Sequence, residues 1–180
     1  MEKTLKTRRA FDGRLLKVDV LEVELDDGRR SIREVVRHPG AVAALVRTHN
    51  GRFLMVRQFR KAIEQELLEV VAGCLEPGET SEQCAVREIR EETGGRVERL
   101  EPLGHVFSAP GFCAERLDLF LADVAALRAA PAGDGDENLE VVELGRADIE
   151  RRIKAGGIHD AKTLAAWALF KANVNGSVSA

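Results

Sequence analysis

The sequence is poor in aromatic residues and in cysteine, and it contains no long apolar run. It has no tyrosine and one tryptophan among 180 residues, so stacking on a ligand would have to come from its seven phenylalanines. Three cysteines, an odd number without metal-ligand spacing, favour the reducing cytoplasm as its location. No apolar run approaches the roughly 18 residues that span a bilayer. The first residues, MEKTLKTRRA, lack the apolar core of a signal peptide, so we expect no membrane attachment.

Charge of one sign is also missing. Basic residues number 27 and acidic residues 30, which gives a net charge of -3. Nucleic-acid binding needs a basic field, so we do not expect a nucleic-acid partner. The hydrophobic share of 44% and the charged share of 32% are those of a globular protein, and the length is that of one domain.

Alternating apolar and polar residues predict a β-rich N-terminal extension over residues 1–37. Residues 15–36 form a predicted hairpin around Asp26-Asp27-Gly28, after a short extended piece at 7–11. Over residues 38–180 we predict strands and helices of a mixed α/β domain. The predicted strands are 41–47, 52–57, 66–71, 97–103, 105–108, 117–122 and 139–144, and the predicted helices are 80–92, 147–155 and 161–172.

The predicted helix 80–92 carries three carboxylates, Glu88, Glu91 and Glu92, on one face. Like charges at this spacing cost a few tenths of a kcal/mol per pair in an ordinary helix. A hard divalent cation would reverse that cost, because Mg²⁺ prefers carboxylate oxygens. Arg87 precedes Glu91 by four positions and can pair with it. A solvated acidic helix face is the alternative interpretation, and it is the commoner one for a lone Glu-Glu pair.

The wider pattern around these residues resembles the Nudix box. Gly73 is followed after five residues by Glu79, and after seven more by Arg87-Glu88-Ile89-Arg90-Glu91-Glu92-Thr93-Gly94. With residue frequencies of about 5–7% each, such a match arises by chance about once in a million chains or less. One position departs from the pattern: Gly95 stands where the family has an aliphatic residue.

The resemblance implies a Nudix-type α/β/α sandwich that hydrolyses a nucleoside diphosphate linked to another group. It also implies Mg²⁺, or Mn²⁺, as cofactor. The implied metal ligands are the carbonyl of Ala72 and the carboxylates of Glu88, Glu91 and Glu92, with Glu91 alternatively bridging to Arg87. The family places a general base on the acidic loop beyond the box, where Glu137 is the first candidate and Glu140 the second. For either residue, a merely solvated loop remains the alternative.

The flanks of the box resemble the ADP-ribose pyrophosphatase branch of this family. The matching stretches are 56–60, 66–73, 108–115 and 157–163. The implied substrate-binding residues are Arg57, Arg60, Glu69, Pro110, Phe112 and Glu115. Arginine suits this role because its planar fork donates two hydrogen bonds to a phosphate.

The sequence therefore predicts hydrolysis of ADP-ribose to AMP and ribose 5-phosphate. Two alternatives remain open: a GDP-mannose or other nucleoside diphosphate sugar pyrophosphatase, and a catalytically weak ADP-ribose-binding sensor. The N-terminal extension resembles the sheet through which this branch forms homodimers, so a homodimer is expected.

Overall fold

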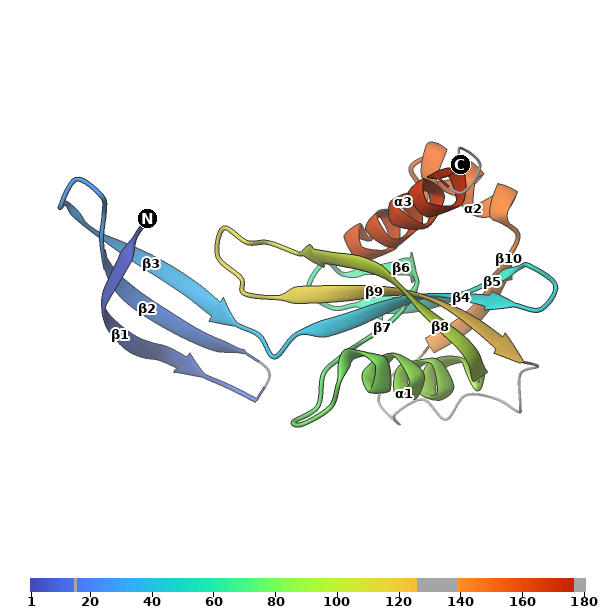
Figure 1. Cartoon of the computed structure of the whole chain (residues 1–180), viewed down its shortest axis with the longest axis horizontal. Coiled ribbons are helices and arrows are strands. Elements are labelled where there is room, and N and C mark those ends of the chain that lie inside the picture. The colour runs from blue at the N-terminus through green and yellow to red at the C-terminus, as the bar shows by residue number, and fades with distance from the viewer. Residues whose placement is uncertain (15, 126–138, 177–180) are drawn as a thin grey trace. The chain divides into compact units, whose positions relative to one another are not determined.

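The computed structural model describes residues 1–14, 16–125 and 139–176, and its contacts divide the chain into two units (Figure 1). The first unit comprises residues 1–40 and 107–116, and the second comprises 41–106 and the residues from 117 onward. No helix among the described residues combines the length and the apolar character of a membrane-spanning segment.

The first unit is built on a three-stranded antiparallel sheet. Strands β1 (Lys3–Asp12), β2 (Lys17–Glu24) and β3 (Arg30–Arg37) lie in that order. Gly28 adopts a φ of 80°, and its N–H donates to the carbonyl of Leu25 at 2.9 Å, which closes the predicted hairpin. The extended piece expected at 7–11 is longer than predicted, because pairing with β2 continues back to Lys3.

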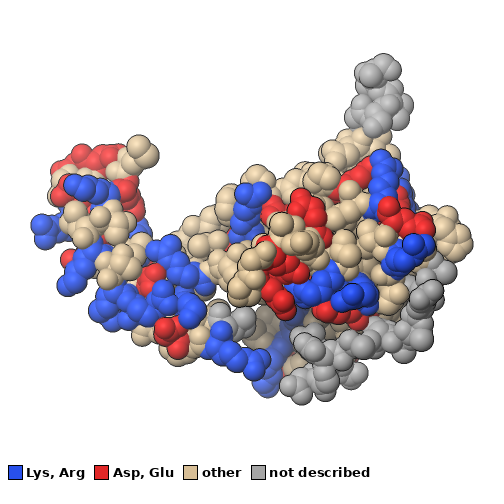
Figure 2. Space-filling view, turned by 60° about the horizontal axis from the view of Figure 1, so that its bottom comes forward, with Lys and Arg blue, Asp and Glu red and all other residues tan. Residues whose placement is uncertain are grey.

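Ion pairs hold the three strands of this small sheet together. Asp19 on β2 is buried and accepts hydrogen bonds from Arg37 on β3 and Arg9 on β1. These bonds, that from Arg37 first, lower the pKa of Asp19 below its ordinary value. Every residue of β1 is exposed. Figure 2 shows Lys and Arg side chains over this unit with Asp and Glu between them.

The second unit is built on a seven-stranded mixed sheet. Its main path runs β10 (Leu139–Leu144), β5 (Phe53–Arg60), β4 (Ala41–Thr48), β9 (Arg116–Ala125) and β8 (Arg96–Phe107). Strand β6 (Gln65–Glu69) pairs with β5, and β7 (Val71–Cys74) pairs with β4. The pair β4–β9 is parallel, whereas β4–β5, β5–β6 and β10–β5 are antiparallel.

Strand β4 separates two apolar clusters because its side chains alternate between the faces of the sheet. Ala43 and Leu45 belong to a cluster with helices α2 (Arg146–Lys154) and α3 (Ala161–Gly176). Val42 and Ala44 belong to a cluster with helix α1 (Ser81–Thr93). Helix α1 therefore covers one face, and α2 and α3 cover the other (Figure 1). This confirms the predicted α/β/α sandwich with a mixed sheet.

Two predicted strand boundaries were wrong. The strand expected at 66–71 is split into β6 and β7, because the chain changes its pairing partner at Val70. The N–H of Val70 donates instead to the Thr163 hydroxyl at 2.9 Å. Conversely, the strands expected at 97–103 and 105–108 form one strand, β8, in which Gly104 adopts a φ of 139° that other residues rarely take.

Candidate active site

Helix α1 begins and ends at well-formed caps, which place its acidic residues. The hydroxyl of Thr80 accepts a bond from the N–H of Gln83, and the Gln83 side chain accepts one from the N–H of Thr80. At the other end, Gly94 adopts a left-handed φ of 67°, and its N–H donates to the carbonyl of Arg90. The helix is therefore continuous through Glu88, Glu91 and Glu92, as the sequence predicted.

Arg87 is the centre of the acidic cluster on α1. Its Nε and Nη2 donate to the two carboxylate oxygens of Glu79, each at 2.9 Å. Its Nη1 donates to Glu88 at 2.6 Å and to Glu91 at 3.2 Å. The expected pair with Glu91 is thus present, and the bonds to Glu79 and Glu88 are additional. One guanidinium therefore joins three carboxylates and connects the loop before α1 to the helix.

The pKa values of this cluster follow from those contacts. Hydrogen bonds from Arg87, and then from the backbone N–H of Glu76, lower the pKa of Glu79 to about 2. The Arg87 pKa is raised, first by its bond to Glu79. Glu88 behaves differently, because burial outweighs its bond to Arg87 and raises its pKa. A divalent metal ion beside Glu88 would favour the charged carboxylate and so lower its pKa, opposite to the effect of burial.

Gly73 provides the space that the Glu88 carboxylate occupies. A Cβ atom added at Gly73 would overlap the carboxylate of Glu88. Gly73 lies on β7, against which α1 packs. The first glycine of the sequence motif therefore has a physical reason: only glycine lets this carboxylate lie against the strand.

The predicted metal ligands lie on α1 and β7. Glu92 is buried, Glu91 and Ala72 are half-buried, and all the proposed donors are oxygen atoms, which suits a hard divalent cation. Within the described ranges, no three His, Cys, Asp or Glu side chains form a ready-made metal site. In this structure Glu88 and Glu91 face the guanidinium of Arg87 instead. The ligand assignment agrees with the donor chemistry and stays a prediction.

The predicted substrate residues of the second unit lie on β5 and β6, and the second general-base candidate, Glu140, lies on β10. Arg57 donates to Glu140 at 2.7 Å, across the pair β10–β5. Arg60 makes two bonds to Glu69, at 2.8 and 2.7 Å. The second candidate for the general base, Glu140, is therefore engaged with a predicted substrate residue. The first candidate, Glu137, lies outside the described residues.

The remaining predicted substrate residues, Pro110, Phe112 and Glu115, belong to the first unit. Phe112 is exposed, and its carbonyl accepts a bond from Val36 of β3 at 2.8 Å. Glu115 lies 3.5 Å from the imidazole of His38. The roles of all these substrate residues stay predictions.

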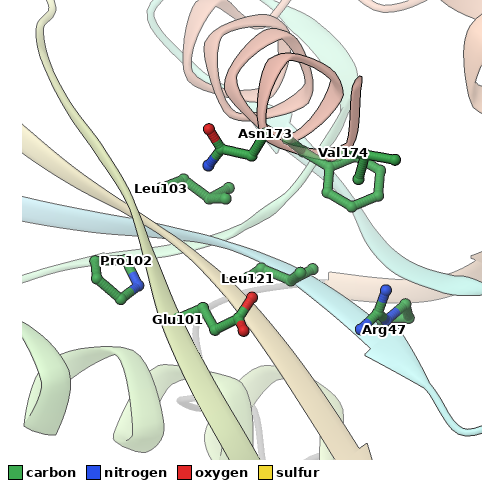
Figure 3. Close-up of a pocket in the computed structure, with 8 residues that line it drawn as sticks. Arg47, Glu101, Pro102, Leu103, Leu121, Asn173 and Val174 are labelled. Carbon is green, nitrogen blue, oxygen red and sulfur yellow. The ribbon is translucent and has the colours of Figure 1, made fainter. Parts of the chain in front are cut away.

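A pocket that the sequence gave no reason to expect lies on the α3 side of the sheet (Figure 3). Its volume is about 430 Å³. None of the predicted site residues lines it; the lining residues are Arg47, Glu101, Pro102, Leu103, Leu121, Phe170, Asn173 and Val174. Its arginine, Arg47, is held by two bonds to Asp123 at 2.7 and 3.0 Å. This pocket is on the sheet face opposite α1.

Known protein families match nearly the whole chain. The NUDIX domain matches residues 37–166. The chain belongs to the Nudix hydrolase family. Residues 2–36 match the nucleoside diphosphate sugar hydrolase N-terminal domain. The resemblance seen in the sequence is therefore confirmed, and the acidic cluster of α1 lies within the matched range.

Several named relatives share most of their length with this Nudix chain. A methanol dehydrogenase activator of Bacillus methanolicus is 42% identical over 92% of this chain and 90% of its own. An ADP-ribose pyrophosphatase of Bacillus subtilis is 40% identical over 90% of this chain and 88% of its own. A GDP-mannose pyrophosphatase of Cronobacter sakazakii is 33% identical over 77% of this chain and 80% of its own.

A solved structure supports the fold. The crystal structure of an ADP compounds hydrolase superposes with a TM-score of 0.84. The two chains are 21% identical, and the match covers 98% of this chain and 95% of the other. At this identity the likeness concerns the fold alone.

Proposed function

We propose that this Nudix hydrolase cleaves the diphosphate of ADP-ribose with water, giving AMP and ribose 5-phosphate. The observation that carries the proposal is the intact acidic cluster around Arg87 on α1. A 40% identical relative that is named ADP-ribose pyrophosphatase supports the choice of substrate.

Nudix hydrolases work with divalent metal ions, and we propose Mg²⁺ here, with Mn²⁺ as a substitute. The carbonyl of Ala72 and the carboxylates of Glu88, Glu91 and Glu92 would hold it. When bound, the ion would neutralise negative charge on the diphosphate and lower the pKa of the attacking water. Arg87 orients Glu88 and Glu91 through its hydrogen bonds, and Gly73 leaves room for the Glu88 carboxylate.

Residues that flank the box in the sequence are the proposed substrate ligands. The guanidinium groups of Arg57 and Arg60, in the second unit, suit the diphosphate. For Pro110, Phe112 and Glu115, in the first unit, the substrate role stays what the resemblance implies. Glu137 or Glu140 would take a proton from the attacking water, and Glu140 would first have to leave Arg57.

A substrate panel tests this function. We expect kcat/KM with Mg²⁺ to be at least about tenfold higher for ADP-ribose than for GDP-mannose, ADP-glucose, NADH or a nucleoside triphosphate. A tenfold preference corresponds to about 1.4 kcal/mol in the transition state. If GDP-mannose leads, the metal site stands and the substrate assignment is wrong. Tight ADP-ribose binding without turnover of any compound would indicate a sensor.

We also propose that the chain forms a homodimer through the sheet of its first unit. Strands β1 and β3 are the edges of that sheet, and β1 is exposed along its whole length. An unpaired edge strand is a template for pairing with a strand of another molecule. In a two-fold symmetric dimer, the same contact covers the edge strand of both protomers. We propose a cytoplasmic location as well, in keeping with the three cysteines and their lack of metal-ligand spacing in the sequence.

Light scattering checks the assembly. We expect a mass twice the 19.8 kDa of the single chain at micromolar concentration. Replacing Thr4 on β1 by proline removes a backbone donor from the sheet, and it should shift the mass toward the monomer. A monomeric mass for the unmodified chain would contradict the dimer.

A further inference from the structure

Glu69 is a fully buried carboxylate whose two oxygens both accept hydrogen bonds from cations. Its side chain is 0% exposed at the end of β6. The Nε of Arg60 donates to Oε1 at 2.8 Å, and Nη2 donates to Oε2 at 2.7 Å. The ammonium of Lys162, on α3, donates to Oε2 as well. A carboxylate in this position has no surface left with which to touch a ligand.

Lys162 also connects Glu69 to Asp160, the residue directly before α3. Lys162 donates to Asp160 at 2.8 Å, and the N–H of Thr163 donates to the other oxygen of Asp160 at 2.9 Å. The two carboxylates and the two cations of this cluster balance in charge. Burial by itself would raise the pKa of Glu69, but Arg60 and Lys162 bond to its charged form and keep that pKa below its ordinary value.

Arg60 is the member of this cluster that reaches the surface. Its side chain is 38% exposed, against 15% for Lys162 and 13% for Asp160. A free arginine side chain has about 2 kcal/mol of rotamer entropy to lose when it binds an anion. Two parallel bonds to Glu69 remove most of that freedom beforehand. A buried ion pair often adds no stability over apolar packing, so stability alone is a weak reason for its presence.

We propose that Glu69 is a positioning residue that holds the Arg60 guanidinium in the orientation needed to bind the substrate diphosphate, with Lys162 fixing Glu69 from α3. This inference rests on the proposed function, in which Arg60 contacts the substrate. It assigns Glu69 an action through Arg60 and no direct substrate contact.

A double-mutant cycle tests the inference. The variants are Arg60→Ala, Glu69→Gln and the two combined, assayed with ADP-ribose at saturating Mg²⁺. We expect each single change to raise KM at least about tenfold with kcat within about twofold, because uniform binding is lost. In the Arg60→Ala background, Glu69→Gln should leave KM unchanged, since its route to the substrate is gone. If Glu69→Gln raises KM in the Arg60→Ala background by the same factor as in the wild-type background, the proposal is overturned.

Asp123→Asn is the matched control for a merely structural effect. It breaks another doubly bonded arginine–carboxylate pair of this unit, that of Arg47 with Asp123. Arg47 is 32% exposed, close to the 38% of Arg60, whereas Asp123 is 30% exposed and Glu69 is 0% exposed. We expect it to lower Tm without changing KM. If Glu69→Gln also lowers Tm and leaves KM at the wild-type value, Glu69 is structural only and the inference fails.

Two further measurements separate the possible failures. If Glu69→Gln does not fold, Lys162→Met replaces it, and its rise in KM should likewise vanish in the Arg60→Ala background; persistence there would overturn the proposal. A wild-type KM in Arg60→Ala overturns the inference and leaves the hydrolysis standing. If the unmodified protein does not hydrolyse ADP-ribose, the proposed function fails. The same four proteins are then compared by their Kd for ADP-ribose, and this comparison decides whether Glu69 acts on ligand binding through Arg60.

Discussion

Glu92→Gln is expected to lower kcat by about 10²–10³-fold while the protein stays folded. Glutamine has nearly the shape of glutamate, so the buried position on α1 can accept it. It lacks the charge with which glutamate would bind a divalent cation. Metal ions supply several kcal/mol of transition-state stabilisation, and each 1.36 kcal/mol is a factor of ten in rate. Steady-state rates over a Mg²⁺ titration, together with circular dichroism and Tm, measure both parts of the expectation.

Glu82→Gln is the matched control on the same helix. Glu82 is exposed in the first turn and belongs to no predicted ligand set. Its replacement removes the same charge from α1 and should leave kcat unchanged, with a stability loss of about 0.5 kcal/mol. If Glu92→Gln keeps a nearly full rate at every Mg²⁺ concentration, the ligand assignment is wrong.

Arg87→Met is expected to destabilise the protein by about 3 kcal/mol, which is the cost of leaving one side of a partly buried ion pair without its partner. For a chain of this size, that corresponds to a fall in Tm of about 10 °C. Methionine keeps the apolar stem but removes the cation that joins Glu79, Glu88 and Glu91. Thermal or urea unfolding at neutral pH measures the loss.

The loss should also depend on pH, because the pKa of Glu79 is about 2 in the folded protein. In the unfolded chain a glutamate titrates near pH 4.3. A depressed folded pKa contributes stability above the unfolded value, and this contribution disappears as the pH falls toward 2. The difference in Tm between the wild type and Arg87→Met should therefore narrow below about pH 4.

Arg90→Met is the control for this variant. Arg90 lies on the same helix, its side chain is 73% exposed, and its nearest carboxylate contact, with Glu91, is 3.9 Å long. Surface ion pairs of this kind contribute about 0–1 kcal/mol. A Tm loss for Arg90→Met as large as that for Arg87→Met, or a loss in Arg87→Met that is independent of pH, would contradict the role given to Arg87.

Local sequence signals were sufficient for α1 and for central strands such as β4. The hydrogen bonds that start and end a helix involve residues three or four positions apart, so Thr80, Gln83 and Gly94 can be recognised without knowing the fold. The same spacing places Glu88, Glu91 and Glu92 near one another. The apolar run at 41–47 likewise predicts a strand, and in β4 the first six residues are buried.

The sequence by itself therefore determined the mixed α/β class, the helix that carries the Nudix box and the three glutamates on its face, and its resemblance to the Nudix family gave the α/β/α layering. Tertiary structure alone decided that β6 and β7 pair with different strands, that Glu79 joins the Arg87 cluster, and that Glu69 lies between Arg60 and Lys162. The reason is physical. Local patterns report which backbone bonds a segment can make with its neighbours, whereas side-chain contacts between different elements depend on strand register and helix packing, which no local pattern contains. This holds for Lys162 and Glu69, 93 positions apart, and also for Glu79 and Arg87, which are only 8 positions apart.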